Sequence, residues 1–155
     1  MTRYGPLSSK VGVLVIGDLL RHHVRLTPGE LVQHNGAVEV ASFDWDDVES
    51  AILRLPSTRF RFPGAVSTIG LGALAAVLLD DPGATPDDGG IDIAVDGETH
   101  GLTISRHHVG GYWVRIVTPT QELLDRLVSR RAARDSLTRP EKVIKFVAEA
   151  ARRNR

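Results

Sequence analysis

Histidine is the residue type in this sequence that is best suited to metal chemistry, because the chain contains six histidines and no cysteine. A zinc or similar ion would therefore depend on imidazole ligands. Adjacent histidines on a strand face opposite sides, so each adjacent pair offers one ligand per face. His23 and His34 can meet across a hairpin, and His107 or His108 can approach from a loop. We expect structural histidines and no metal, with these four as the ligands if a metal is bound.

Three carboxylates surround a tryptophan at Asp44-Trp45-Asp46-Asp47. They could bind a divalent cation, but the stretch lacks the glycine and the closing glutamate of a calcium loop. We therefore expect Asp44 to cap the turn that follows Phe43. Trp45 is expected to be buried against the last helix of the domain, and the alternative is a platform on which a ligand stacks.

Asp87, Asp88 and Asp92 lie in or beside a stretch rich in glycine and are expected to be solvated. Two carboxyls that act as general acid and base need burial to separate their pKa values, and the neighbouring glycines argue against burial. The chain contains no G-x-S-x-G elbow, P-loop or dinucleotide-binding fingerprint. We therefore expect a protein that is not an enzyme and needs no cofactor.

Basic side chains are the candidates for contact with a partner. Residues 59–62 read Arg-Phe-Arg-Phe, so a strand there would have one cationic and one aromatic face. From Thr118 to Arg155 the chain holds ten basic and five acidic residues. This excess is predicted to face an acidic partner or nucleic-acid phosphates, although a solvated helix surface would look the same. The predicted partner-binding residues are Arg59, Arg61, Arg130, Arg131, Arg134, Lys142 and Lys145.

Length and composition narrow the class of protein. The 155 residues suit one domain, and a hydrophobic content of 42% is enough for a core. The formal net charge is zero, which argues against a whole-protein field for nucleic acid or anionic lipid. Val11–Ile16 is too short for a secretion signal, so we expect a cytoplasmic protein. The uncharged stretch Ala65–Leu79 is shorter than the ~20 residues of a membrane span, and we expect a buried helix or a pair of core strands.

Alternating apolar and polar residues predict two groups of antiparallel strands. Within Arg21–Val48, Pro28-Gly29 is typical of a type II turn and Asn35-Gly36 of a type I′ turn. Asp96-Gly97 marks a second hairpin. The other predicted strands are Val11–Ile16, which could instead begin a short helix, Val48–Leu55, which could also be helical, and Tyr112–Val117.

Two capped amphipathic helices are predicted after the last strand. Thr118 is the expected cap of the first helix, because Pro119 follows it and Gln121 stands three residues later. Thr138 is the expected cap of the second helix, with Glu141 completing a capping box. Both helices carry an apolar stripe at helical spacing.

Three stretches carry a family resemblance: Val24-Arg25-Leu26-Thr27 with Gly29, then Trp45-Asp46-Asp47-Val48, then Tyr112–Val117 running into Thr118–Arg131. In this order they resemble bacterial pleckstrin-homology-like (PH-like) domains over roughly residues 11–131. The resemblance implies an α+β fold, in which an antiparallel barrel or roll of about seven strands is closed by a C-terminal amphipathic helix. The basic loop used by lipid-binding members is absent, which disfavours phosphoinositide binding.

The expected function is a non-enzymatic binding or assembly module that docks a protein or peptide through its β-edges and helix surfaces. We divide the chain into a PH-like domain with its capping helix, residues 1–135, and a basic helical tail, residues 136–155. Self-association is expected, because the apolar stripe of the tail needs cover and a second copy can supply it. The alternatives are a small metal-dependent enzyme built on the clustered histidines and a nucleic-acid binder that uses the basic helices.

Overall fold

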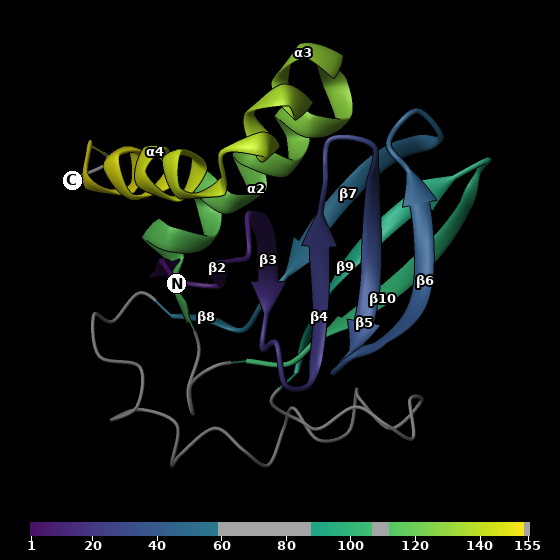
Figure 1. The fold of residues 1–155 in the computed structure, drawn as a ribbon, viewed down its shortest axis with the longest axis horizontal. Coiled ribbons are helices and arrows are strands. Elements are labelled where there is room, and N and C mark those ends of the chain that lie inside the picture. The colour runs from purple at the N-terminus through teal and green to yellow at the C-terminus, as the bar shows by residue number, and fades with distance from the viewer. Residues whose placement is uncertain (59–87, 107–111, 154–155) are drawn as a thin grey trace.

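Residues 1–58, 88–106 and 112–153 are described by the structure, which is a computed structural model. They form an α+β fold with two antiparallel sheets followed by helices (Figure 1), so the broad α+β class expected from the sequence is confirmed. The predicted element at 65–79 and the Arg-Phe alternation at 59–62 lie outside the described residues.

The first sheet is a meander of six strands in sequence order. Its strands are β1 (Arg3–Tyr4), β2 (Leu7–Lys10), β3 (Val13–Gly17), β4 (His22–Leu26), β5 (Glu30–Asn35) and β6 (Val38–Asp44). The predicted strand at Val11 begins later, because Val11 and Gly12 form a turn with φ values of 51° and 74°. Gly36 has a φ of 58° but Asn35 ends β5 without a positive φ, so the predicted type I′ turn is wrong.

The second sheet has three strands in the order β10-β9-β7. They are β7 (Val48–Arg54), β9 (Gly89–Val95) and β10 (Glu98–Ile104). The predicted hairpin at Asp96-Gly97 is confirmed, and both residues have the positive φ of a type I′ turn, 51° and 76°. Two further short strands, β8 (Ser57–Thr58) and β11 (Tyr112–Trp113), pair in parallel with each other.

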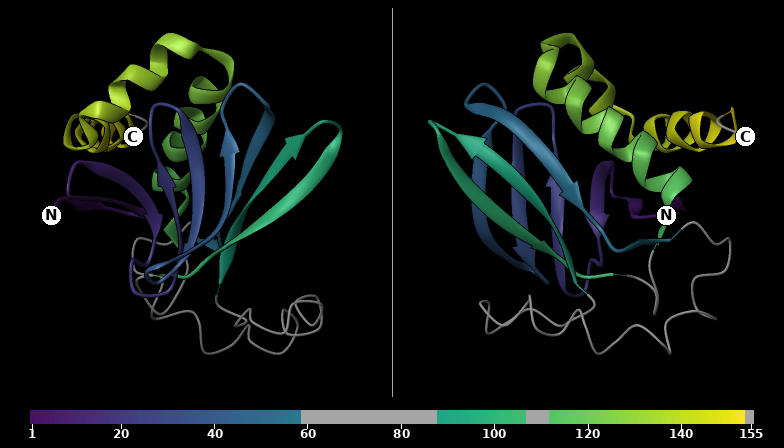
Figure 2. Two further views of the ribbon diagram at one scale, coloured as in Figure 1. Left: turned by 45° about the vertical axis from the view of Figure 1, so that its right-hand side comes forward. Right: turned by 180° about the vertical axis from the view of Figure 1, so that it is seen from behind.

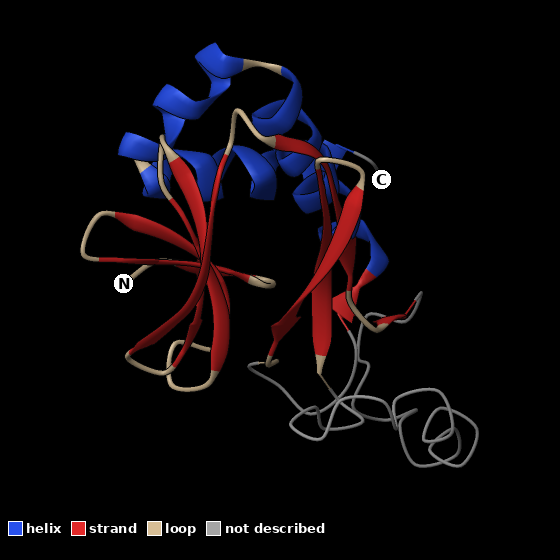
Figure 3. Ribbon diagram, turned by 90° about the vertical axis from the view of Figure 1, so that its right-hand side faces the viewer, coloured by secondary structure: helices blue, strands red, loops and turns tan. Residues whose placement is uncertain are grey.

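The closed barrel expected from the sequence does not form among the described residues. After β6 the chain turns at Asp44–Asp47 and enters the other sheet instead of adding a seventh strand to the first. Figure 3 shows the two sheets facing each other, with the helices across one end of both. Side chains from both sheets and from the helices share one core cluster, which includes Leu26, Ile93 and Leu124. The architecture is therefore two separate sheets covered by helices.

The first helix, α2 (Val114–Ser129), begins before the predicted cap. The expected strand Tyr112–Val117 is wrong beyond Trp113, and Thr118 is not the cap, because its hydroxyl donates to the Val114 carbonyl inside the helix. The β-branched residues here favour a strand locally. Tertiary packing overrides that preference: Ile116 lies so close to Gly5 that a Cβ on Gly5 would overlap it.

The chain ends in three further helical segments, α3 (Arg131–Arg134), the 3-10 helix η2 (Asp135–Thr138) and α4 (Pro140–Arg153). Thr138 closes η2 and bonds the Asp135 carbonyl, so it is not the predicted cap of α4. Pro140 takes the first position of α4, where its missing N–H costs nothing. Leu137 is buried, so the link between the helices is part of the core.

Helix α4 packs onto the body of the protein and does not form a separate tail. It contacts β1, β2, β3 and α2, and its apolar side chains Val143, Ile144 and Val147 are buried. Figure 2 shows it lying against the N-terminal hairpin and beside α2. The apolar stripe is thus covered within the chain, which removes the reason for expecting a second copy to cover it.

Candidate functional site

The two histidines expected to meet across the first hairpin do so. His23 on β4 and His34 on β5 are direct cross-strand partners, and their rings stack with centroids 5.2 Å apart and planes 8° apart. Both side chains are buried. The hairpin prediction therefore placed the pair correctly.

Both ring nitrogens of His23 are engaged. Nδ1 lies 3.1 Å from the Arg21 carbonyl, to which only a protonated nitrogen can donate. Nε2 accepts a hydrogen bond from Nε of Arg25 at 3.3 Å. This arrangement selects the neutral ring with its proton on Nδ1. No lone pair is left for a metal, so His23 is a structural histidine.

Burial sets the protonation of both rings. It lowers the pKa of His23 below 6.5, and Arg25 and His34 lower it further, although the Arg21 carbonyl opposes them. Burial also lowers the pKa of His34, with Arg25 adding to the effect and Glu39 opposing it. Nδ1 of His34 is buried without a hydrogen-bond partner among the described residues. The pair is therefore neutral at pH 7.

The other predicted metal ligands, His107 and His108, lie outside the described residues. Among residues 1–58, 88–106 and 112–153, no three histidine, aspartate or glutamate side chains come close enough together to hold an ion. The described part of the chain thus offers no assembled metal centre.

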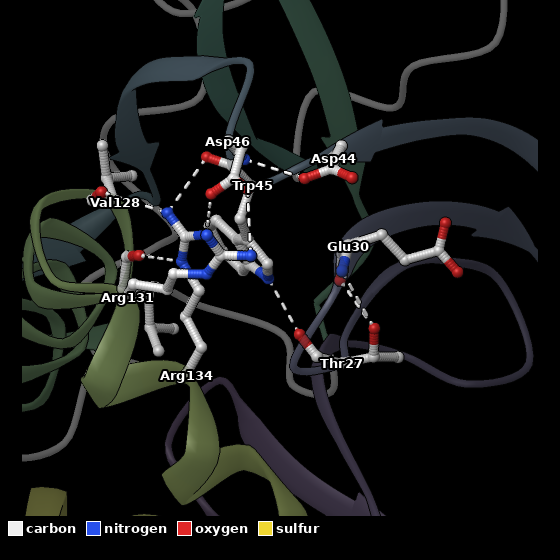
Figure 4. A network of polar contacts seen from close by, with 9 residues as sticks. Thr27, Glu30, Asp44, Trp45, Asp46, Val128, Arg131 and Arg134 are labelled. Carbon is white, nitrogen blue, oxygen red and sulfur yellow. Dashed lines mark hydrogen bonds and ion pairs between the residues drawn. The ribbon is translucent and has the colours of Figure 1, made fainter.

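The predicted acidic cluster serves the corner between the two sheets (Figure 4). Asp44 caps it as expected, because its carboxylate accepts the Asp46 N–H at 2.8 Å. Trp45 is buried, and its indole N–H donates to the Thr27 carbonyl at 2.8 Å. The corner is therefore a packed structural joint.

Arg134 was a predicted partner contact, but its guanidinium is buried at this corner, with the side chain only 9% exposed. It donates to the Leu127 carbonyl at 2.9 Å, the Trp45 carbonyl at 3.2 Å and the Asp46 carboxylate at 2.5 Å. The bond from Arg134, and then the charge of Arg131, lower the pKa of Asp46. These contacts leave Arg134 no free donor face for a partner, and we assign it an internal role.

The other predicted cations lie on the surface or outside the described residues. Arg131 has an 84% exposed side chain and lies 3.6 Å from the Asp46 carboxylate. Arg130, Lys142 and Lys145 are exposed. Arg59 and Arg61 fall in the stretch 59–87, which the structure does not describe.

The two described aspartates that were expected to be solvated, Asp88 and Asp92, lie just before and within β9 and differ in their environment. Asp88 is buried, with a 3% exposed side chain that lies 4.0 Å from Arg21, so its expected exposure is wrong. The reason is that Gly89 enters β9 directly and packs against Leu55, which brings Asp88 to the end of the sheet. Asp92 forms a two-contact ion pair with Arg54 at 2.5 and 2.6 Å. Asp87 lies outside the described residues.

The roles of two side chains were not predicted from the sequence: the bond of Arg25 to His23 and the bonds of Gln121 to the backbone of β7. Arg25 stands two residues after His23 on the same strand, so alternation already places both side chains on one face. Gln121 on α2 accepts the Leu53 N–H at 2.7 Å and donates to the Ala51 carbonyl at 2.8 Å. Nothing in the sequence predicts the contact of Gln121 with β7, because it depends on how α2 lies beside that strand.

Comparison of the chain with family models, with curated proteins and with solved structures finds no match. Among the described residues, every helix is too short or too polar to cross a membrane.

Proposed function

We propose that this chain is a non-enzymatic docking module with a PH-like core, and that it binds an acidic protein segment through the exposed cations of its C-terminal helices. The order of elements supports the PH-like part: four antiparallel strands, β3–β6, precede three antiparallel strands, β7, β9 and β10, and then the helix α2. The hairpin β1–β2 and the helix α4 would then be additions that pack on each other.

The observation that carries the docking proposal is the division of α4 into two faces. Its apolar residues are buried against the body, whereas Lys142 and Lys145, which stand three residues apart on one side of the helix, are exposed. Arg130 adds an exposed cation where α3 begins. Cations held on a rigid helix can meet carboxylates at little entropic cost, and long-range attraction speeds the encounter.

The excess of positive charge in the C-terminal segment favours an acidic partner. The segment from Thr118 to the end has ten basic and five acidic residues, whereas the rest of the chain has nine basic and fourteen acidic ones. An acidic ligand is therefore drawn to the helices and repelled by the sheets. Action in the cytoplasm and independence of cofactors are parts of the same proposal.

The test compares charge reversal at two places. Lys142→Glu with Lys145→Glu changes the proposed contact, and Arg3→Glu with Lys10→Glu makes the same change in net charge on the N-terminal hairpin. Binding of a fluorescent polyglutamate peptide is measured by anisotropy at low and moderate salt. We expect the helix variant to lose most of the binding and the hairpin variant to keep it.

Two outcomes would contradict the proposal. One is the absence of polyglutamate binding to the unaltered protein at low salt. The other is tighter binding to a single-stranded oligonucleotide of equal charge, which would favour the nucleic-acid alternative.

A further inference from the structure

The stacked histidines lie beside the β3–β4 loop, where hydrogen bonds to one carbonyl group connect three segments of the chain. The Arg21 carbonyl accepts hydrogen bonds from Nδ1 of His23 at 3.1 Å and from the Gly36 N–H at 2.8 Å. Arg21 belongs to the β3–β4 loop, and Gly36 to the turn between β5 and β6. The His23 ring therefore helps to hold the end of the β4–β5 hairpin against that loop.

The same loop joins the first sheet to the second. The Ser105 N–H donates to the His22 carbonyl at 2.8 Å, and the Asp18 N–H donates to the Ser105 carbonyl at 2.9 Å. Ser105 directly follows β10. Bonds around residues 18–22 thus connect the six-stranded sheet to the end of the three-stranded sheet.

A proton added to His23 has only one place to go. Nδ1 already carries a hydrogen, so the new hydrogen must occupy Nε2, which now accepts from Nε of Arg25. An imidazolium N–H and a guanidinium N–H would then face each other, and that contact must break. The ring of His34 stacks on that of His23, so a proton on one ring disfavours a proton on the other.

The charges around the pair do not offset this cost. Arg25 on β4 disfavours a proton on either ring, and only Glu39 on β6 favours one on His34. The Asp88 carboxylate, which lies 4.0 Å from the Arg21 guanidinium, is near a cation of its own. The neighbouring groups that favour a charged His23 are the backbone carbonyls of Arg21 and Asp18.

We propose that the His23–His34 pair is an acid-sensitive lock on the β3–β4 loop. Uptake of a solvent proton by either ring loosens this loop and the hydrogen bonds that join the two sheets. The lock is a property of the fold and does not depend on which partner the helices bind. It gives the protein a second state at mildly acidic pH.

The direction of the effect follows from linkage. A histidine whose pKa is lower in the folded state than its ordinary value of 6.5 stabilises the fold fully above that value. This contribution is lost as the pH falls below 6.5, because the unfolded chain then binds protons that the folded chain does not. The lock is therefore closed at neutral pH and opens on acidification.

The experiment follows the full chain from about pH 8 to about pH 5, the range in which only histidine ordinarily titrates. Amide hydrogen exchange is converted to protection factors, which correct for the intrinsic effect of pH. We expect the Gly36 and Ser105 amides to lose protection at the acid end, while the Leu53 amide, held by Gln121, keeps it. Equal behaviour of all three amides would overturn the proposal, since the opening would then be global or absent.

A variant separates the pair from the other histidines. His34→Phe keeps a flat ring for stacking and cannot take a proton, and His100→Gln, on β10 beside Phe43, is the matched control. The melting temperature of the unaltered protein and of His100→Gln should fall together on acidification, and that of His34→Phe should fall less. A fall of equal size in His34→Phe would overturn the proposal. If that variant does not fold, the exchange measurement on the unaltered protein decides.

Discussion

At the scale of single residues, Arg134 shows how one cation can join distant parts of a fold. Its guanidinium reaches carbonyls at the end of α2 and both the backbone and the carboxylate of the corner before β7 (Figure 4). A planar group with five fixed donors suits this geometry, and an ammonium group on a flexible stem does not. The corner that carries Trp45 is therefore held by a side chain from another element.

Arg134→Met should lower the free energy of unfolding by about 2 kcal/mol or more, because it leaves the buried carbonyls of Leu127 and Trp45 without a donor. Arg131→Met is the control, since that side chain is exposed and its ion pair to Asp46 is long. Its cost should stay below about 1 kcal/mol. Urea denaturation measures both values, and equal costs would contradict the assigned role of Arg134.

Acid should also weaken the turn at Asp44–Asp47 that Arg134 holds, but at a lower pH than it opens the histidine lock. The pKa of Asp46 is lowered from 3.8 by the hydrogen bond from Arg134 and by the charge of Arg131. A carboxyl whose pKa is lowered stabilises the fold above its ordinary value, and the contribution is lost as the pH falls below about 3.8. Asp46→Asn should flatten the stability curve in that range, and an unchanged slope in equilibrium unfolding would contradict this.

At the scale of elements, α2 closes an edge of the second sheet. Among the described strands, β7 pairs with β9 alone, and an unpaired edge can recruit strands from other chains. The carboxamide of Gln121 bonds the N–H of Leu53 and the carbonyl of Ala51, as a peptide group of a neighbouring strand would. The edge is therefore satisfied by a helix side chain at this point.

Gln121→Ala should cost about 1–3 kcal/mol of stability, because two partly buried backbone groups lose their partner. Glu122→Ala, at an exposed position of the same helix, is the control and should change stability by less than about 0.5 kcal/mol. Thermal unfolding measures the difference. Exchange of the Leu53 amide should become faster in the first variant only, and identical exchange in both would argue against the closure.

At the scale of the whole molecule, α4 covers one side of the hydrophobic core. Its buried stripe faces β1, β2, β3 and α2, while charged side chains of both signs, with cations in excess, occupy its outer surface. Arg126 of α2 also lies over the ring of Phe146, 5.4 Å from its centroid, which ties the two helices at their rim. Loss of this helix would uncover apolar surface on both the sheet and α2.

Neighbouring substitutions on α4 test this directly. Val147→Asp places a carboxylate in the core and should destabilise the fold by at least about 3 kcal/mol. Lys145→Asp makes a larger change of charge at an exposed position and should alter stability by less than about 0.5 kcal/mol. Chemical denaturation compares them, and a tolerated Val147→Asp would show that α4 is a detachable tail.

Local rules predicted β3–β7, β9 and β10, but they did not predict β1 and β2 and placed the helix boundaries poorly. Alternation and the Asp96-Gly97 pair predicted the hairpins, since these signals arise within a few residues, and the hairpin prediction also brought His23 to His34. The start of α2 could not be predicted, because Ile116 is held by packing against Gly5 at the other end of the chain. Arg134 looks like its exposed neighbours in sequence, and only the tertiary fold distinguishes it.

The contact of α4 with the N-terminal hairpin has a consequence for synthesis on the ribosome. The strands β1–β3 are translated long before α4, the helix that packs against them. Such long-range contacts form late and slow the search for the native state. A nascent chain would therefore keep apolar surface of these strands uncovered until α4 has left the exit tunnel, and this surface is a target for chaperones during that interval.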